Sequence, residues 1–398
     1  MRTPALAALA ALLCITSAGV PARAQVPERT IEEIKVETQA RSERGAYPLG
    51  GLAPDDVRAA LAQISTRDRD EWARGWSNVA SKYMNQAANA ATPAERDAAY
   101  LRAWRLFYFA QWPVPSSAGK QAAYQNALDA YLRHAALQDP KLEVVRIPFE
   151  GSEIVAYLRL PKATGPVPIV IAISGLDSRK ETVAETYATL LPHGIGFIAV
   201  DSPGTGQAPV KVAPHSERMF SKVIDYLLTR PEIDPKRIAA HGVSFGGYWA
   251  TKLAILERDR LAGVVAQSPP IDGFFSEKFL REGTLGNREY LFDLAPAFVA
   301  VVEGATTTDD LARLLPPLSL AQEGLLGKPS APMLLVGGVK DTQVPFTDMV
   351  ALLATGDVPK DAWINPSGGH LGREAKGWTD PVIFAKVILP WEVRLLKP

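Results

Sequence analysis

The sequence predicts an α/β protein, with a mostly parallel sheet covered by helices on both faces and a helical domain in front of it. Three observations predict this class. Short apolar runs alternate with helical patterns after about residue 140, the chain before that point has helical periodicity, and an aromatic-rich segment interrupts the alternation once. Alternating strands and helices are typical of a parallel sheet enclosed between two helical layers.

The composition indicates a folded chain without a charged binding surface. Of the 398 residues, 47% are hydrophobic and 22% are charged, which is ordinary for a globular protein. Lys plus Arg and Asp plus Glu each number 43, so net charge is near zero. A nucleic-acid partner would call for a basic surface. We therefore expect a small-molecule substrate and no nucleic acid; the oligomeric state is not indicated.

Residues 1–24 have the pattern of a signal peptide. Arg2 supplies the positive charge, Ala5 to Ile15 form an apolar run, and Ala22-Arg23-Ala24 is a small-x-small cleavage site that leaves Gln25 as the first mature residue. A transmembrane anchor is the alternative, but the run is too short to span a bilayer. We expect export to a bacterial periplasm or secretion, with no stable membrane anchor.

Cysteine usage agrees with that expectation. The only cysteine, Cys14, lies inside the apolar run, so the mature chain has neither a disulfide nor a thiolate nucleophile.

The chain up to about residue 140 divides into two parts. Residues 25–52 are polar and glycine-containing, which predicts a flexible lead-in. Residues 53–140 are predicted to form a helical domain, in which Thr92-Pro93-Ala94-Glu95 is a strong helix start because Thr92 caps and Glu95 reaches back. Aromatic residues such as Trp72 and Trp76 recur at helical spacing. They either line a substrate channel or form the core of a bundle, and their periodicity favours the core.

Residues 141–398 are predicted to form the catalytic domain. A hairpin turns at Glu150-Gly151-Ser152. The buried strands that follow are expected at 167–173, 195–200, 238–243, 261–266, 333–336 and 362–364. Helices are expected at 183–191, 217–228 and 245–256. The segment at about 271–330 does not alternate, and we expect a mostly helical cap insertion over the carboxyl ends of the strands, where α/β proteins bind ligands.

One motif carries chemistry. Gly242-Val243-Ser244-Phe245-Gly246 matches G-x-S-x-G, a weak pattern when it stands alone. Here it joins a strand to a helix, the strand–turn–helix setting in which such a serine is exposed as a nucleophile. This setting predicts the α/β-hydrolase fold with Ser244 as the nucleophile.

The base and the acid follow from chain order. In this fold the acid and the histidine come after the serine, and His370 is the only histidine beyond Ser244. Asp341 closes the segment that follows an apolar run, which makes it the preferred acid; Asp348 and Asp357 are the alternatives. The predicted roles are general base for His370 and orientation of that histidine for Asp341.

The oxyanion hole needs two amides. The Phe245 N–H at the start of a helix is predicted to be one donor. The loop Ile173-Ser174-Gly175-Leu176 is placed to supply the second, from Leu176 or Gly175. No spacing of His, Asp and Glu suggests a metal site, and the glycine-rich turn at 201–206 lacks the ending of a phosphate-binding loop. No cofactor is expected.

Several segments together carry a family resemblance from about residue 95 to the end. They are 100–112, 122–135, Ser174-Gly175-Leu176-Asp177-Ser178-Arg179-Lys180-Glu181, 201–206 and 233–248. The chain resembles the esterase family that includes the fermentation–respiration switch protein and dihydroxypseudooxynicotine hydrolase. The resemblance implies a helical domain capping the active site and a metal-free Ser-Asp-His mechanism. Members cleave esters, and some cleave carbon–carbon bonds with an extra acid from the cap, a region in which Glu277 lies here.

The function expected is therefore hydrolysis of a carboxylic ester by an acyl-enzyme, with an apolar or aromatic substrate. Cleavage of a carbon–carbon bond in a diketone-like substrate is a variant. A peptidase of the prolyl oligopeptidase type and a non-catalytic binding protein on the same fold are the rivals; the helical N-terminal part argues against the first, and the presence of all three triad residues against the second.

Overall fold

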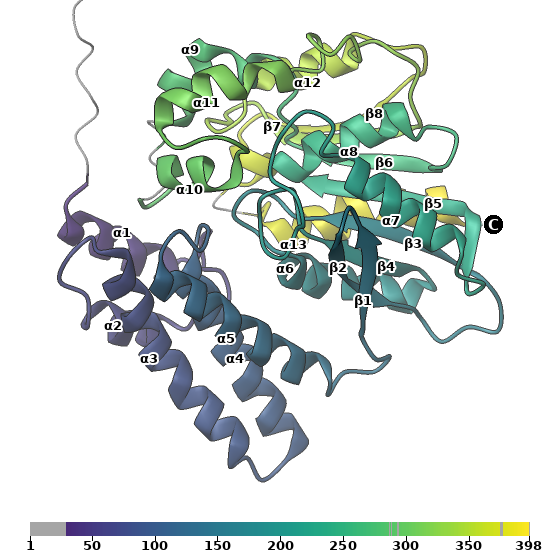
Figure 1. The fold of residues 1–398 in the computed structure, drawn as a ribbon. Coiled ribbons are helices and arrows are strands. Elements are labelled where there is room, and N and C mark those ends of the chain that lie inside the picture. The colour runs from purple at the N-terminus through teal and green to yellow at the C-terminus, as the bar shows by residue number, and fades with distance from the viewer. Residues whose placement is uncertain (1–28, 286, 288, 293, 375–376, 398) are drawn as a thin grey trace, which may run out of the picture.

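A computed structural model describes residues 29–397 except 286, 288, 293, 375 and 376. The predicted signal peptide therefore lies outside the described residues. Figure 1 shows a helical domain beside a sheet that is covered by helices, with a further helical group above the sheet. No helix in the described part of the chain combines the length and the apolar character needed to cross a membrane.

Five helices precede the sheet. They are α1 (Ile31–Glu43), α2 (Pro54–Leu61), α3 (Arg69–Ala88), α4 (Pro93–Gln111) and α5 (Ala118–Ala135). Thr92 and Glu95 form the expected capping box at the start of α4. Trp72 and Trp76 are buried with ring centroids 5.6 Å apart, so these periodic aromatics belong to the core of the bundle.

The prediction of a flexible lead-in over residues 25–52 is wrong for its described part. Helix α1 begins at a capping box made by Thr30 and Glu33, and it buries Ile34. Leu49 is also buried. The helix is mostly polar and shows little apolar periodicity, which is why the sequence pattern hid it.

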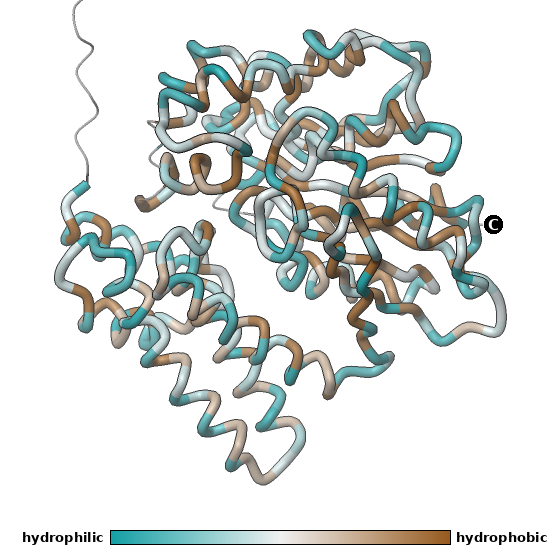
Figure 2. The backbone as a smooth tube through the Cα atoms, in the orientation of Figure 1, coloured by the Kyte–Doolittle hydropathy of each residue, from teal (hydrophilic) through white to brown (hydrophobic). Residues whose placement is uncertain are grey.

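One eight-stranded sheet forms the centre of the molecule. Its strands are β1 (Glu143–Phe149), β2 (Ser152–Arg159), β3 (Val167–Ile173), β4 (Gly196–Val200), β5 (Ile233–Val243), β6 (Gly263–Gln267), β7 (Met333–Gly338) and β8 (Asp361–Asn365). They lie in the order β1-β2-β4-β3-β5-β6-β7-β8. The pairs β1–β2 and β2–β4 are antiparallel and the others are parallel. Hydrophobic residues dominate these strands in Figure 2. The predicted α/β fold is confirmed.

Helices pack on both faces of the sheet. The helices of the sheet region are α6 (Lys180–Tyr187), α7 (Arg218–Leu228), α8 (Phe245–Leu256), α12 (Phe346–Leu353), α13 (Asp380–Ile383) and α14 (Leu389–Leu396), with 3₁₀ turns at Ala188–His193 and His370–Gly372 and a π-helix at Phe384–Ile388. On one face the ring of His241 in β5 meets Tyr187 and Phe384. Neighbouring residues of a strand point to opposite faces, and α8 covers β5 from the other side.

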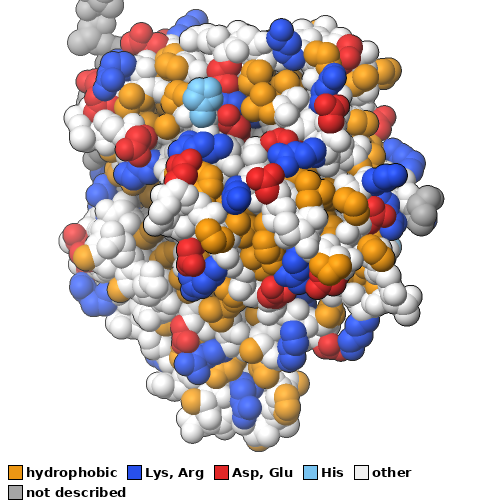
Figure 3. All heavy atoms as spheres, turned by 45° about the vertical axis from the view of Figure 1, so that its right-hand side comes forward, with side chains coloured by type: hydrophobic (Ala, Val, Ile, Leu, Met, Phe, Trp, Pro, Cys, Tyr) orange, Lys and Arg blue, Asp and Glu red, His pale blue; other side chains and the backbone are white. Residues whose placement is uncertain are grey.

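The segment between β6 and β7 is the predicted helical insertion. It contains a 3₁₀ turn at Gly273–Phe275, α9 (Glu277–Phe279), a π-helix at Leu280–Thr284, α10 (Leu294–Val301), α11 (Thr308–Leu314) and a 3₁₀ turn at Pro316–Leu318. In Figure 1 its helices α9, α10 and α11 form the group above the helical domain. On the face drawn in Figure 3, positive and negative side chains are interspersed.

Candidate active site

Ser244 occupies a sharp turn between strand and helix. It follows the last residue of β5 and precedes the first residue of α8, with φ of 54° and ψ of −121°. A non-glycine residue in this region of backbone space is strained, and such strain is typical of functional positions. The amide of Ser244 donates to the Gln267 carbonyl at 2.8 Å, so the neighbouring strand β6 helps to hold the turn.

The glycines of the motif are required by close backbone packing. A Cβ on Gly242 would collide with the backbone of Gly246, and a Cβ on Gly246 would collide with the carbonyls of Ser174 and Ile173. Residues without a side chain at these two positions therefore let α8 start directly against β3 and β5.

His370 lies within hydrogen-bonding reach of Ser244. Its Nε2 is 2.9 Å from the Ser244 Oγ, and its Nδ1 is 2.8 Å from the Asp341 Oδ2. The loop after β8 that carries His370 is held by the end of β6: the Gln267 side chain donates to the Leu371 carbonyl, and the Leu371 amide donates to the Ser268 hydroxyl, both at 2.9 Å. The structure thus brings the three residues far apart in sequence into one hydrogen-bonded row.

Asp341 is held as a charged acceptor. It follows β7, and its Oδ1 accepts the amides of Gln343 and Val344, each at 2.9 Å. Burial by itself would raise the pKa of Asp341. The charge of His370 and the hydrogen bonds from the histidine and the two amides outweigh burial and lower this pKa below its ordinary value. The carboxylate is therefore ionised at neutral pH.

The two alternative acids lie elsewhere. Asp348 is in the first turn of α12, and its carboxylate accepts the backbone amides of residues 271–274 at 2.7–3.2 Å. It ties the start of the insertion to α12. Asp357 is exposed in the turn before β8. Neither carboxylate contacts His370.

Glu277 is placed away from the reacting serine. Its side chain is 64% exposed and pairs with Arg281 at 2.9 Å on the outside of the insertion. It is absent from the lining of the pocket at Ser244.

The loop after β3 carries the two candidate amides for the second oxyanion donor, Gly175 and Leu176. The Gly175 amide donates to the Ser178 hydroxyl at 2.6 Å, so of the two candidates Leu176 keeps an amide that donates to no described residue. Leu176 and Phe245 both line the pocket at Ser244. Phe245 is the first residue of α8, where N–H groups have no partner within the helix.

Arg179 fixes this loop to the helical domain, a role that the sequence analysis did not assign. The guanidinium is fully buried and donates to the Leu176 carbonyl at 3.1 Å. It also donates to the Pro113 carbonyl at 2.7 Å, just beyond the end of α4. The helical domain therefore positions the residue that would supply the second oxyanion donor.

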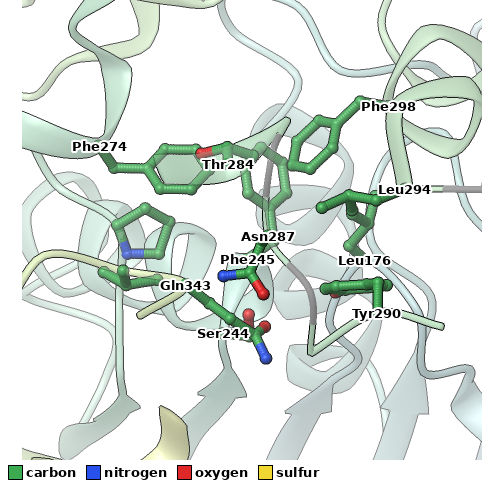
Figure 4. A pocket seen from close by; sticks show the side chains of 12 residues that line it. Leu176, Ser244, Phe245, Phe274, Thr284, Asn287, Tyr290, Leu294, Phe298 and Gln343 are labelled. Carbon is green, nitrogen blue, oxygen red and sulfur yellow. The ribbon is translucent and has the colours of Figure 1, made fainter. Parts of the chain in front are cut away.

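A narrow pocket opens at Ser244. Its volume is about 30 Å³ and it is lined by Leu176, Ser244, Phe245, Pro270, Phe274, Thr284, Asn287, Tyr290, Leu294, Phe298, Gln343 and Val344. Figure 4 shows the side chains of these residues around the cavity. Most come from the insertion, so the sequence pattern located the region of the pocket but not its individual residues. Within the described ranges, no group of three His, Cys, Asp or Glu residues is placed to hold a metal ion.

Comparison with known proteins identifies a family. The family model "Esterase FrsA-like" matches residues 61–357. Hydrolyase poxO of Penicillium oxalicum is 29% identical over 231 residues, which are 53% of this chain and 55% of the relative, so the chain matches about half the length of that protein. Esterase FrsA of Citrobacter koseri is 28% identical over 292 residues, 69% of this chain and 66% of the relative. Hydrolase LUC6 of a Fusarium species is 26% identical over 83% of this chain and 90% of its own.

Solved structures show the same fold. The 2,6-dihydroxy-pseudo-oxynicotine hydrolase superimposes with a TM-score of 0.71 at 20% identity, covering 92% of this chain and 95% of its own. AbyA5 superimposes with a TM-score of 0.70 at 18% identity, covering 92% and 93%. The predicted α/β-hydrolase fold and the resemblance are both confirmed. The match of the family model to residues 61–357 shows that this chain belongs to the FrsA-like esterase family.

Proposed function

We propose that this protein hydrolyses a carboxylic ester with Ser244 as nucleophile, His370 as general base and Asp341 as the acid that orients the histidine. The observation that carries the proposal is the continuous row of hydrogen-bonding atoms from Asp341 through His370 to the Ser244 hydroxyl, at 2.8 and 2.9 Å. A serine hydroxyl becomes an effective nucleophile when an oriented base takes its proton.

The reaction would proceed in two steps. Ser244 Oγ attacks the ester carbonyl while His370 Nε2 accepts the hydroxyl proton, and the tetrahedral oxyanion is held by the amides of Phe245 and Leu176. Collapse releases the alcohol, which takes the proton from His370. Water then attacks the acyl-enzyme with His370 again as base, which releases the acid and restores Ser244. Asp341 stabilises the imidazolium in both steps.

Ester cleavage is favoured over carbon–carbon cleavage. The latter chemistry is expected to use an additional acid from the insertion, and Glu277 is exposed and paired with Arg281. The pocket at Ser244 is lined mainly by aromatic and aliphatic side chains. An apolar or aromatic small-molecule ester fits such a lining.

A peptidase of the prolyl oligopeptidase type is less well supported. The described N-terminal part consists of helices α1 to α5 and provides no β-propeller in front of the sheet. A panel of esters and peptides distinguishes the two activities, and turnover of peptides in preference to esters would replace the ester proposal.

The test of the nucleophile is Ser244→Ala. We expect this variant to lose turnover of aryl esters by roughly 10⁵- to 10⁶-fold and to lose labelling by a fluorophosphonate probe. Ser81→Ala, on the exposed side of α3, is the matched control and should behave as wild type. Labelling or turnover that persists in Ser244→Ala would remove Ser244 from the mechanism.

We also propose that the protein is exported. The support is the n-region, apolar run and Ala22-Arg23-Ala24 site at the N-terminus. Expression of the full chain in a bacterium should yield a periplasmic product that begins at Gln25, as read by N-terminal sequencing. A cytoplasmic product that retains residues 1–24 would contradict export.

A further inference from the structure

Three buried hydroxyl oxygens in the described part of the chain have no hydrogen-bond partner, those of Ser116, Thr182 and Thr284, and of these residues only Thr284 lines the pocket at Ser244. Thr284 is 4% exposed, and its Oγ1 makes no hydrogen bond. Three other described threonines are equally buried, and each donates to a backbone carbonyl at 2.7 or 2.8 Å: Thr38, Thr205 and Thr251. A buried hydroxyl without a partner is costly, so one that belongs to a residue lining the pocket at Ser244 calls for an explanation.

The local helix geometry explains why Thr284 has no partner. A threonine in a helix normally donates to the carbonyl four residues earlier, as Thr38 does to Ile34. Thr284 ends the π-helix that begins at Leu280, and the Leu280 carbonyl accepts the Leu285 amide at 3.0 Å instead. Single π-turns of this kind recur at functional sites.

Thr284 is one of the residues that line the pocket containing Ser244, and its hydroxyl oxygen is buried there. In Figure 4 it lies toward Phe274 and Phe298, at the side of the group away from Ser244. The rings of Phe245, Phe274 and Phe298 form a triangle with centroid separations of 6.3–6.4 Å. An aromatic wall surrounds a single polar atom at the end of the pocket opposite the reacting serine.

The two amide side chains that line the pocket, Asn287 and Gln343, already make hydrogen bonds. Asn287 donates to the Thr342 carbonyl at 2.9 Å and accepts the Glu289 amide at 2.8 Å. Gln343 donates to the Glu289 carboxylate at 2.8 Å. Thr284 therefore differs from these two residues in that its side chain makes no hydrogen bond at all.

We propose that Thr284 determines specificity: its hydroxyl donates to an oxygen carried at the far end of an otherwise apolar, aromatic substrate group. A keto, ether or hydroxyl oxygen supplies the acceptor. The inference rests on the proposed function, because it requires the narrow pocket to widen around a substrate with its ester at Ser244 and its ring among the phenylalanines. A substrate without the oxygen would leave the Thr284 hydroxyl unpaired in the closed site, and unpaired polar groups are what give such sites their discrimination.

The experiment compares matched probes that carry or lack that oxygen at the same place, with an alkyl spacer between the ring and the reacting group so that the ring substituent does not change the leaving group. For the acyl side, two fluorophosphonates carry a phenylpropyl tail whose ring bears a para-acetyl or a para-isopropyl group. For the alcohol side, the acetates of 2-(para-acetylphenyl)ethanol and 2-(para-isopropylphenyl)ethanol are used. In the wild type we expect the acetyl member of one series to react roughly 5- to 100-fold faster, in labelling rate or in kcat/KM.

Two variants of Thr284 separate the effect of the hydroxyl group on specificity from the effect of side-chain volume. Thr284→Val keeps the shape and removes the hydroxyl, and it should bring the acetyl-to-isopropyl ratio close to one. Thr284→Ser keeps the hydroxyl and should retain the preference. Because the hydroxyl has no protein partner, Thr284→Val should unfold at the same or a higher temperature than the wild type.

The outcomes distinguish this inference from the function on which it rests. Absence of fluorophosphonate labelling in the wild type would remove the serine hydrolase function and the inference with it. Labelling at Ser244 with a ratio near one in both series, or with a ratio that Thr284→Val leaves unchanged, would overturn the role of Thr284 alone.

Discussion

The sequence offers three aspartates after β7 as the acid of the triad, namely Asp341, Asp348 and Asp357. Their surroundings in the structure distinguish them. Asp341 has one carboxylate oxygen on two backbone amides and the other on His370. The Asp348 carboxylate accepts the amides of residues 271–274, and Asp357 is exposed. The lowered pKa of Asp341 keeps it charged beside the histidine, as stabilisation of an imidazolium requires.

Asp341→Asn tests that role at the scale of one atom. An amide in place of the carboxylate removes the charge and favours the wrong tautomer of His370, so kcat for an aryl ester should fall by roughly 10⁴-fold. The geometry should survive, because Asn still accepts from the amides of Gln343 and Val344. Asp357→Asn is the control and should match wild type in steady-state kinetics. Equal activities of the two variants would exclude Asp341 from the triad.

At the scale of elements, a histidine joins three helices. His134 of α5 places its Nδ1 2.7 Å from Asp97 of α4 and its Nε2 3.5 Å from Glu185 of α6. Burial of the ring opposes its charge, but the two carboxylates outweigh burial and raise the pKa of His134 above its ordinary value. The protonated ring thereby fastens the helical domain to the first helix of the sheet region.

His134→Gln should reveal this contact through pH. A group whose pKa is raised by folding contributes stability that is complete below its unfolded pKa, about 6.5, and is lost as pH rises through the folded pKa. We expect the variant to lose about 1 kcal/mol of unfolding free energy at acidic pH, since both carboxylates are partly exposed, and less at alkaline pH. Urea denaturation across this range measures the difference. A gap that widens toward alkaline pH would contradict the assignment.

At the scale of the whole molecule, the helical domain supports the pocket from outside the sheet. Trp112 stacks on Tyr290 with centroids 5.5 Å apart, and Trp72 meets Phe292 at 4.7 Å. Arg41 of α1 donates to the Glu289 carbonyl at 2.5 Å. Tyr290 lines the pocket on one side and contacts Trp112 of the helical domain on the other. The helical domain therefore supports a residue of the pocket wall.

Trp112→Ala should therefore change binding as well as stability. The loss of a buried indole is expected to cost about 3–5 kcal/mol of unfolding free energy. Without the stack, Tyr290 should lose its fixed place and KM for an aromatic ester should rise several-fold. Trp104→Ala is the matched control, because Trp104 is also buried but packs against Tyr131 within the helical domain. It should lower stability without raising KM, and an equal KM for both variants would exclude the support role.

The sequence by itself determined the mostly parallel sheet, the succession of its strands and helices along the chain, and the serine and histidine that meet at the end of β5, with Asp341 preferred among three aspartates. Apolar runs, a strand–turn–helix serine and a single downstream histidine suffice for these, because hydrophobic periodicity and chain order are local or one-dimensional properties. The same reasoning failed for α1, whose helix depends on a capping box and on contacts with Glu289 rather than on an apolar stripe.

Only the tertiary structure decided which polar groups have partners. The Gly175 amide donates to Ser178, Asp348 accepts amides of the insertion, and Thr284 lines the pocket with an unpaired hydroxyl. All three are facts about distances between atoms in the folded chain. Hydrogen bonds are satisfied or left open by geometry within a few tenths of an ångström, which residue type and spacing do not encode. The class of reaction was therefore readable from the chain, whereas the polar atom proposed to select the substrate emerged from the fold.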